Sequence, residues 1–212
     1  MTTAVLFDLD RTLIQYDPDL PGIFRNALTE LGLTPTADRF EHFRDRFLVR
    51  FAGLEGDPFV SAATDHAREY ALPVGGERLA EAFLDAERDA ARVHPGVRSG
   101  LDALADHPLG VVTNGYGPVQ RRKLAATGID HHFATVVTPD SVGAFKPDHA
   151  VFEAAIDRVP ADAYAFVGDS VEADVLPANE LGFRSVLYGD ADDRADACVS
   201  DPGDFGRIAD LL

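Results

Sequence analysis

The stretch that decides the fold is Ala4-Val5-Leu6-Phe7-Asp8-Leu9-Asp10-Arg11-Thr12, near the start of the sequence. An apolar run that stops at an acidic residue is typical of a short strand covered on both faces, as in a parallel sheet. Similar apolar runs occupy residues 109–112, 134–137, 164–167 and 185–188, and we expect a short last strand and a terminal helix after them. Helical patterns lie between the runs. This alternation predicts an α/β fold: a Rossmann-like, doubly wound parallel sheet.

One of the helical patterns follows a proline. Apolar residues recur on one helical face from Val151 to Val159. Pro147 stands before them, where it suits the first turn of a helix. We therefore expect a helix that takes Pro147 into its first turn and packs on the sheet.

A long stretch without strand signals separates the first two apolar runs. Its apolar residues follow helical spacing, as in Phe40, Phe43, Phe47 and Phe51, and Asp57-Pro58 is typical of a helix start. The sequence therefore predicts a core domain of residues 1–14 and 93–212, and a helical cap of residues 15–92. At this spacing the phenylalanines suit the interior of the insertion, and a ligand cavity lined by them is the alternative.

The charge of the chain excludes some classes of partner. The 212 residues include 36 Asp and Glu against 19 Lys and Arg, which gives a formal net charge of −17. This charge repels nucleic-acid phosphate and anionic membranes, so we expect no binding to nucleic acid or to a membrane. Of the basic residues, only Lys123 and Lys146 are lysines. Strong acidity with few lysines favours adaptation to a salt-loaded cytoplasm, and a biased genome composition is the alternative.

Other features favour a cytoplasmic protein. The sequence has no apolar run of about 18 residues, and its N-terminal run lacks the basic flank of a signal peptide. The single cysteine, Cys198, excludes an intrachain disulfide and a multi-cysteine zinc site. We expect a cytoplasmic monomer or homodimer.

Polar residues with related chemistry follow the expected strands. They are Asp8 and Asp10, then Thr113-Asn114-Gly115, then Lys146, and finally Asp169 and Asp174. Because function lies at the carboxyl ends of the strands in such sheets, we expect these residues to form one site. Each motif alone is ordinary turn or helix-start chemistry. Ordinary turn and helix-start chemistry does not explain why all of these motifs occur together in this order along the chain.

This combination of side chains points to phosphoryl chemistry beside a metal. A dense cluster of carboxylates needs a cation, and oxygen ligands without His or Cys favour a hard ion such as Mg²⁺. A lysine, a hydroxyl group and turn amides nearby suit the oxygens of a phosphoryl group. One aspartate can attack phosphorus to form an aspartyl-phosphate, and a second can protonate the leaving oxygen and then activate water.

In its motifs and their order, the sequence resembles the haloacid dehalogenase-like (HAD) hydrolase superfamily. The motifs are DLDRT, VVTNG, Lys146 before Pro147, and VGDSVEAD. The likeness spans nearly the whole chain, with the helical insertion in the place of the family's first-site cap. It implies that Asp8 is the nucleophile and Asp10 the general acid and base. Arg11 stands where glycine is frequent, at a position whose backbone matters more than its side chain.

The resemblance also implies which residues bind phosphate and metal. The implied phosphate ligands are Thr113, Asn114, Gly115 and Lys146. The implied Mg²⁺ ligands are Asp8, Asp169 and the backbone carbonyl of Asp10, with Asp174 in support.

Single residues separate the branches of the superfamily. The dehalogenases resemble this pattern but lack the second aspartate, so Asp10 favours phosphoester cleavage. Phosphonate-cleaving members use a cap lysine, which residues 15–92 lack, and sugar-phosphate mutases commonly rely on one as well. The resemblance therefore implies a Mg²⁺-dependent phosphatase. A HAD mutase, a phospho-acceptor signalling protein and a non-catalytic binding protein are the alternatives.

The resemblance says less about the substrate. The stretch TNGYGPVQRRKLAATGI looks like a subgroup with nucleotide and acylneuraminate phosphatases. We expect a small phosphorylated metabolite that is nucleotide-like, a sugar phosphate or phosphoglycolate-like. In capped members the turn between the first cap helices usually touches the leaving group, and here that region is placed near Arg46, Arg50 and Gly53-Leu54-Glu55-Gly56. A solvated arginine face with an ordinary glycine turn is the alternative.

Overall fold

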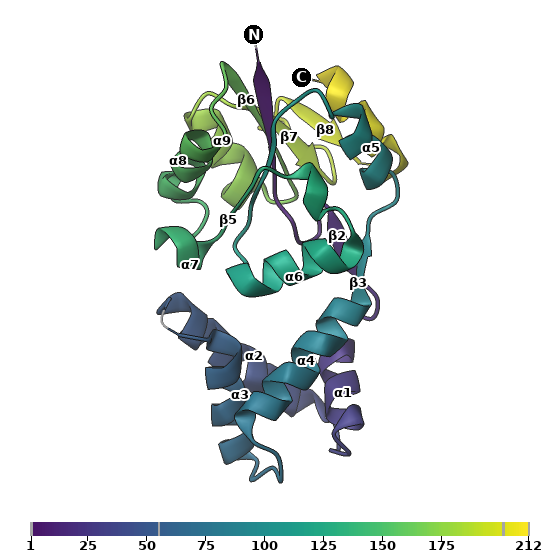
Figure 1. Ribbon diagram of the computed structural model, residues 1–212, viewed down its shortest axis with the longest axis vertical. Helices are drawn as coiled ribbons and strands as arrows, with labels where there is room; N and C mark the ends of the chain where they lie inside the picture. The colour runs from purple at the N-terminus through teal and green to yellow at the C-terminus, as the bar shows by residue number, and fades with distance from the viewer. Residues whose placement is uncertain (1, 55, 201, 212) are drawn as a thin grey trace. The chain divides into compact units, whose positions relative to one another are not determined.

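The computed structural model describes residues 2–54, 56–200 and 202–211, and it divides into two compact units (Figure 1). The first unit comprises Met1–Gln15 and Arg92–Leu212, and the second comprises Tyr16–Ala91. The first is built on a sheet and the second is built of helices. That the helical unit acts as a cap stays a prediction.

The first unit contains a six-stranded sheet in the order β5-β4-β1-β6-β7-β8. The strands are β1 (Thr3–Phe7), β4 (Leu109–Val112), β5 (Thr135–Val137), β6 (Ala163–Gly168), β7 (Arg184–Tyr188) and β8 (Ala197–Val199). Each pair of neighbours is parallel. The strand order reverses on either side of β1, so the sheet is doubly wound and its switch point lies at β1. The predicted Rossmann-like α/β fold is therefore confirmed.

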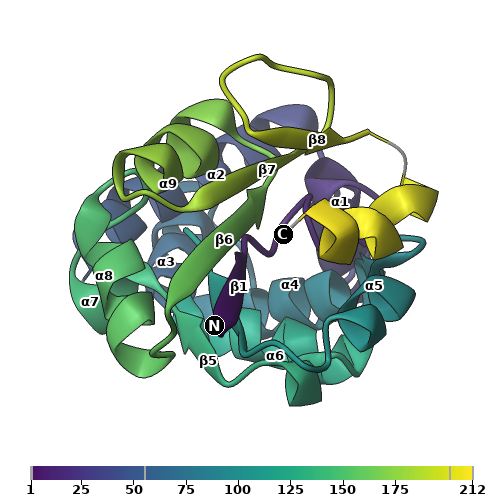
Figure 2. The same ribbon diagram turned by 90° about the horizontal axis from the view of Figure 1, so that it is seen from above.

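Helices cover both faces of this sheet. They are α5 (Val97–Ala103), α6 (Gly117–Thr127), α7 (Pro139–Val142), α8 (His149–Arg158) and α9 (Leu176–Glu180), together with a 3-10 helix over Pro202–Leu211. Figure 2 shows α8 and α9 on one side of the strands, and α5 with the C-terminal 3-10 helix on the other. Strands covered on both faces explain the continuous apolar runs of the sequence.

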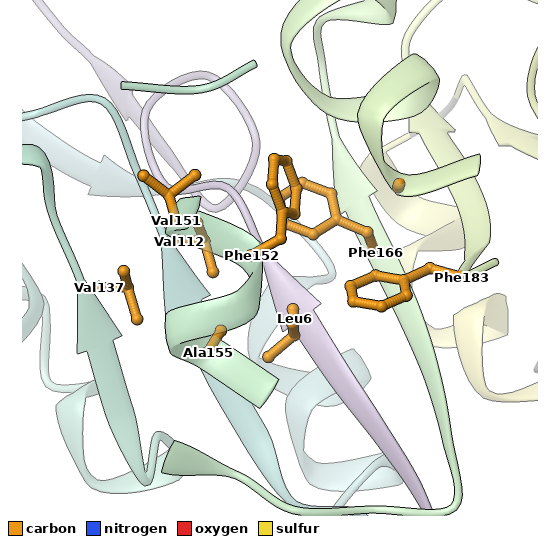
Figure 3. Packing of buried hydrophobic residues seen from close by; sticks show 9 residues of the cluster. Leu6, Val112, Val137, Val151, Phe152, Ala155, Phe166 and Phe183 are labelled. Carbon is orange, nitrogen blue, oxygen red and sulfur yellow. The ribbon is translucent and has the colours of Figure 1, made fainter. Parts of the chain in front are cut away.

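The two faces of β1 illustrate how the core is divided. Leu6 packs with Phe152 of α8 and Phe166 of β6 in one buried cluster (Figure 3). The next residue, Phe7, points the other way and stacks on Phe205 of the 3-10 helix, with ring centroids 6.1 Å apart. Both Leu6 and Phe7 are fully buried. The residue that follows, Asp8, leaves the strand at the edge where the polar motifs gather.

Helix α8 begins later than the sequence predicts. Asp148 is its N-cap, and the Oδ1 atom of Asp148 accepts a hydrogen bond from the backbone N–H of Ala150 at 2.9 Å. Placing Pro147 in the first turn was wrong, because the aspartate side chain supplies the cap one residue further on. Pro147 instead ends the loop that carries Lys146.

The second unit consists of α1 (Leu20–Glu30), α2 (Ala37–Ala52), α3 (Pro58–Glu69) and α4 (Gly76–Ala90). Asp57 caps α3 as predicted, accepting from the N–H of Val60 at 2.9 Å. Phe43 of α2 is buried between Phe24 and Phe83, with ring centroids at 4.9 and 5.0 Å. Phe43 and Phe51 are thus buried in the interior of this unit as expected, whereas Phe40 and Phe47 are half-buried and Phe40 also lines a pocket with Phe24. Within the described parts of both units, no helix has the length and apolar character needed to cross a bilayer.

Two short strands were missed by the sequence analysis. β2 (Ile14–Tyr16) and β3 (Ala91–Val93) form a two-stranded sheet where the chain passes between the units. Helix α4 ends at Ala90, directly before β3. Three residues are too few to show strand periodicity, so only the pairing defines these elements.

Candidate active site

The loops at the carboxyl ends of the parallel strands carry the candidate residues. Asp8 directly follows β1, Thr113 directly follows β4 and Asp169 directly follows β6. These three strands are neighbours in the sheet, so their ends meet at one edge. Lys146 reaches the same place from the loop between α7 and α8.

Lys146 joins two of the predicted carboxylates. Its Nζ atom donates to Asp8 Oδ1 at 2.7 Å and to Asp174 Oδ1 at 2.6 Å. The side chains of Lys146 and Asp174 are each 2% exposed, so these charges are removed from water. Burial by itself lowers the pKa of Lys146, but the charges of Asp8 and Asp174 prevail and the pKa is raised. Lys146 is therefore a fixed positive charge between two carboxylates.

The carboxylate of Asp8 is held at both oxygens. Lys146 contacts Oδ1, and the hydroxyl of the fully buried Thr12 donates to Oδ2 at 3.2 Å. Burial raises the pKa of Asp8 to about 6, the charge of Lys146 opposes the rise, and the charge of Asp174 adds to it. Asp8 is thus an oriented carboxylate that is ionised at neutral pH.

Three carboxylates lie close enough to share a cation. Single oxygens of Asp8, Asp169 and Asp174 lie within 4.8 Å of one another. Burial first, and then the charge of Asp8, raises the pKa of Asp169, as expected for crowded acids. Arg11 meets this group from outside, with its Nε 3.1 Å from Asp169 Oδ2. The donor set consists only of carboxylate oxygens, which suits a hard divalent cation.

Backbone contacts hold Asp174 in this cluster. The N–H of Ser170 donates to Asp174 Oδ2 at 3.0 Å. A Cβ atom on Gly168 would lie only 2.3 Å from the same oxygen. The glycine of the VGDS stretch is therefore needed because Asp174 packs directly on its α-carbon.

The Thr113-Asn114-Gly115 segment is brought to the site, but Asn114 uses its side chain locally. Its Nδ2 donates to the carbonyl of Lys146 at 2.9 Å, and its Oδ1 accepts from the N–H of Lys146 at 2.7 Å. Asn114 therefore holds the backbone of the lysine loop. The Thr113 hydroxyl accepts from the N–H of Gly115 at 3.2 Å. That this segment binds phosphate stays a prediction.

Helix α6 supplies two site residues that the sequence analysis did not assign. Lys123 Nζ lies 2.6 Å from Asp10 Oδ1, and Gln120 Nε2 donates to Asp10 Oδ2 at 2.6 Å. Both side chains are buried, whereas that of Asp10 is 32% exposed. The signal was present: a scarce lysine lies three residues after a glutamine, on the helix that follows the TNG motif. Both lysines of the chain thus contact predicted catalytic aspartates.

The residues placed near a leaving group belong to the helical unit. Arg50 pairs with Asp65 of α3 at 2.6 Å, and Arg46 Nε lies 3.5 Å from His42 Nε2. Gly53 and Leu54 follow α2, and Glu55 lies outside the described residues. A role of this segment in substrate contact stays a prediction.

A family model for haloacid dehalogenase-like hydrolases matches residues 2–182 of the chain. The match includes all the candidate residues described above. The chain belongs to the haloacid dehalogenase-like hydrolases. The resemblance seen in the sequence is therefore confirmed.

Curated relatives of this HAD protein are named as a phosphatase and a nucleotidase. It is 38% identical over 199 residues to the glyceraldehyde 3-phosphate phosphatase of Methanothermobacter thermautotrophicus, covering 88% of this chain and 85% of the relative. It is 28% identical over 189 residues to the pyrimidine 5'-nucleotidase YjjG of Escherichia coli, covering 85% and 83% of the two chains. These names differ in substrate.

One of the similar solved structures is named as a dehalogenase. The 2-haloacid dehalogenase of Pseudomonas syringae pv. Tomato DC3000 matches with a TM-score of 0.75 and 29% identity, over 100% of this chain and 98% of the dehalogenase. The fold is thus shared by HAD proteins of different chemistry. The choice between them depends on the site.

Proposed function

We propose that this HAD protein is a Mg²⁺-dependent phosphoric monoester hydrolase that acts on a small phosphorylated metabolite through an aspartyl-phosphate intermediate. The observation that carries the proposal is the setting of Asp8. Its carboxylate is held by Lys146 and Thr12, shares a possible cation site with Asp169 and Asp174, and lies two residues before Asp10. The chain thereby supplies a nucleophile, a site for a cation and a proton donor.

The carboxylate cluster fits Mg²⁺. Asp8 and Asp169 would hold the ion with the backbone carbonyl of Asp10, and Asp174 would support it through the same cluster. The raised pKa values of Asp8 and Asp169 support a bound cation, because a positive charge would relieve the repulsion between them. When bound, Mg²⁺ would neutralise charge on the oxygens of the transferring phosphoryl group.

The chemistry assigned to the chain's own residues has two steps. Asp8 attacks phosphorus, the bond from phosphorus to the leaving oxygen breaks, and Asp10 gives that oxygen a proton. A water molecule then attacks phosphorus, Asp10 takes its proton, and the bond to Asp8 breaks to release phosphate. Lys146 compensates the negative charge on Asp8 and on the phosphoryl oxygens throughout. Thr113 and the amides of Asn114 and Gly115 would bind those oxygens.

The presence of Asp10 favours phosphoester cleavage over dehalogenation. A halide needs no proton to leave, whereas an alkoxide does, so the acid role of a second aspartate serves phosphoester cleavage and not dehalogenation. Relatives named as a phosphatase and a 5'-nucleotidase, at 38% and 28% identity, support the same choice. We propose a nucleotide-like, sugar-phosphate or phosphoglycolate-like substrate, with residues 16–91 acting as a cap that excludes bulk water. The cytoplasmic location and the monomeric or homodimeric state also stay predictions.

The first test is hydrolysis of p-nitrophenyl phosphate in molar KCl. We expect activity with Mg²⁺, none with EDTA, and a loss of at least about 10³-fold in Asp8→Asn, because the amide cannot act as nucleophile. Asp106→Asn is the matched control, since Asp106 is exposed and precedes β4 at the opposite end of the strand. Equal rates in wild type and Asp8→Asn would contradict the proposal. A lasting phosphoryl adduct without turnover would favour a signalling protein instead.

A further inference from the structure

One face of α6 carries two side chains that contact Asp10. Gln120 and Lys123 lie three residues apart, so their side chains leave the helix on the same side. Lys123 Nζ contacts Asp10 Oδ1 at 2.6 Å, and Gln120 Nε2 contacts Asp10 Oδ2 at 2.6 Å. Gln120 and Lys123 are buried, with 1% and 3% of the residue exposed. Two buried donors from one helix therefore fix both oxygens of one carboxylate.

Gln120 also connects Asp10 to the predicted phosphate-binding loop. The same Nε2 atom donates to the Thr113 hydroxyl at 2.8 Å. Both acceptors lie on the Nε2 side of the amide, and among the described residues Gln120 Oε1 has no hydrogen-bond partner. The opposite orientation would place the amide oxygen against a carboxylate oxygen. The amide thus sets the distance between Asp10 and Thr113.

The TNG motif is shaped to admit this side chain. A Cβ atom on Gly115 would lie 1.8 Å from Gln120 Nε2 and 2.3 Å from its Cδ. Gln120 therefore packs directly on the backbone of Gly115. The Thr-Asn-Gly turn and the polar face of α6 therefore pack against each other through Gln120.

We propose that Gln120 and Lys123 are positioning residues that hold Asp10 in the orientation needed for proton transfer, in register with Thr113. The inference rests on the proposed function, since it concerns the proton donor of that reaction. A carboxylate has about four acceptor positions on its two oxygens, and the contacts from α6 use one position on each oxygen. Lys123 would act through its contact with Asp10, and Gln120 through its contacts with Asp10 and Thr113.

The test compares leaving groups of different basicity. The enzyme is assayed with p-nitrophenyl phosphate, whose leaving group departs without a proton, and with glycerol phosphate, whose alkoxide needs one. The value of kcat/KM reports the steps up to release of the leaving group, in which Asp10 acts as acid. We expect Lys123→Met to lower kcat/KM for glycerol phosphate at least about tenfold more than for p-nitrophenyl phosphate, within the range typical of general acid catalysis. Gln120→Met should likewise lower the ratio of kcat/KM for glycerol phosphate to kcat/KM for p-nitrophenyl phosphate.

A double-mutant comparison separates positioning from general damage. In the Asp10→Asn background, Lys123→Met should change either rate by less than about twofold, because the group that it positions is gone. Arg121→Gln removes the same charge from an exposed position of α6 and should leave the ratio unchanged. The thermal unfolding midpoint of each variant checks that the fold is retained.

Two results would overturn the inference. One is an equal loss for both substrates in Lys123→Met and Gln120→Met, and the other is an undiminished effect of Lys123→Met in the Asp10→Asn background. Asp8→Asn is assayed beside them to distinguish this failure from that of the proposed function. If Asp8→Asn is inactive while Lys123→Met behaves like Arg121→Gln, only the role of α6 is rejected. If Asp8→Asn stays active, the proposed function fails and the inference fails with it.

Discussion

Arg11 occupies an unfavourable backbone conformation at the edge of the carboxylate cluster. Its φ angle is +71°, in the left-handed region that favours glycine, and its guanidinium pairs with Asp169. The side chain is 76% exposed, so the ion pair stabilises the fold only slightly. Its larger effect is on the cation site, because a positive charge beside Asp169 competes with a bound metal.

We therefore predict that Arg11→Gly binds Mg²⁺ more tightly. Removal of an exposed ion pair is worth up to about 1 kcal/mol, which corresponds to a decrease of up to about fivefold in the Mg²⁺ dissociation constant. Titration calorimetry of the metal-free protein with Mg²⁺ measures this dissociation constant. Arg11→Lys keeps both the charge and the left-handed backbone, so its affinity should stay close to that of wild type. An unchanged affinity in Arg11→Gly would show that the guanidinium does not compete for the site.

At the level of residues, the sequence predicted the acids and Lys146 but missed the two side chains that contact Asp10. Asp8, Lys146, Asp169 and Asp174 could be gathered because parallel strands end at one edge, and the structure does bring these four together. Gln120 and Lys123 could not be assigned, because helical spacing shows which side chains share a face but not what that face meets. The same limit applies to Asn114, whose amide proved to bind the Lys146 backbone.

Among the elements, α3 carries the buried histidine of the helical unit. His66 is fully buried, and its Nδ1 lies 3.1 Å from Nδ1 of His42 on α2. Arg46 donates to the other nitrogen of His42, so His42 donates and His66 accepts. Burial, followed by the charges of His42 and Arg39, lowers the pKa of His66 to about 4, and Asp38 opposes this only weakly. Protonation of His66 would place two N–H groups face to face.

This arrangement predicts that acid destabilises the helical unit through His66. The pKa of His66 in the folded protein, about 4, lies below the ordinary histidine value of 6.5, so the unfolded state binds more protons between these values. The resulting stability is present above pH 6.5 and is lost as the pH falls toward 4, by about 2 kcal/mol between pH 7 and pH 5. Urea unfolding at both pH values measures the loss.

In the variant His66→Asn, the free energy of unfolding should lose the part of its pH dependence that comes from His66. Other groups, including Asp8, titrate in the same range, so the difference between variant and wild type is the informative quantity. His149→Asn is the control, because the His149 side chain is 41% exposed and pairs with Glu180 on the surface. Equal pH dependence in wild type and His66→Asn would show that His66 does not titrate on unfolding.

The predictability of the elements depended on their length. Strands such as β1 and β6 carry continuous apolar runs, and the helices carry repeated stripes, so their existence could be inferred. β2 and β3 have three residues each and are stabilised by pairing between distant parts of the chain. The start of α8 was misplaced because proline and aspartate both suit a first turn, and only the cap geometry decides between them.

For the whole molecule, the dominant property is charge. With 36 acidic against 19 basic residues, the chain repels itself at low salt. Much of the acid is exposed, as at Asp106 and Asp157, and the pairs that do form on the surface, such as Arg44 with Asp45, contribute little. The long-range repulsion therefore outweighs the local attraction in dilute buffer.

Salt should therefore stabilise this protein. The screening length falls from about 10 Å at 0.1 M to about 3 Å at 1 M, which removes repulsion between all but adjacent charges. We predict that the thermal unfolding midpoint rises between low and molar KCl, by about 2–4 °C for each kcal/mol of repulsion relieved. Reversing two exposed acids, in Asp106→Lys with Asp157→Lys, should raise the midpoint at low salt and reduce the gain from KCl, because less repulsion is left to screen. If the midpoint of the wild type does not rise with KCl, the acidity is no adaptation to salt, and composition bias is the better explanation of the charge.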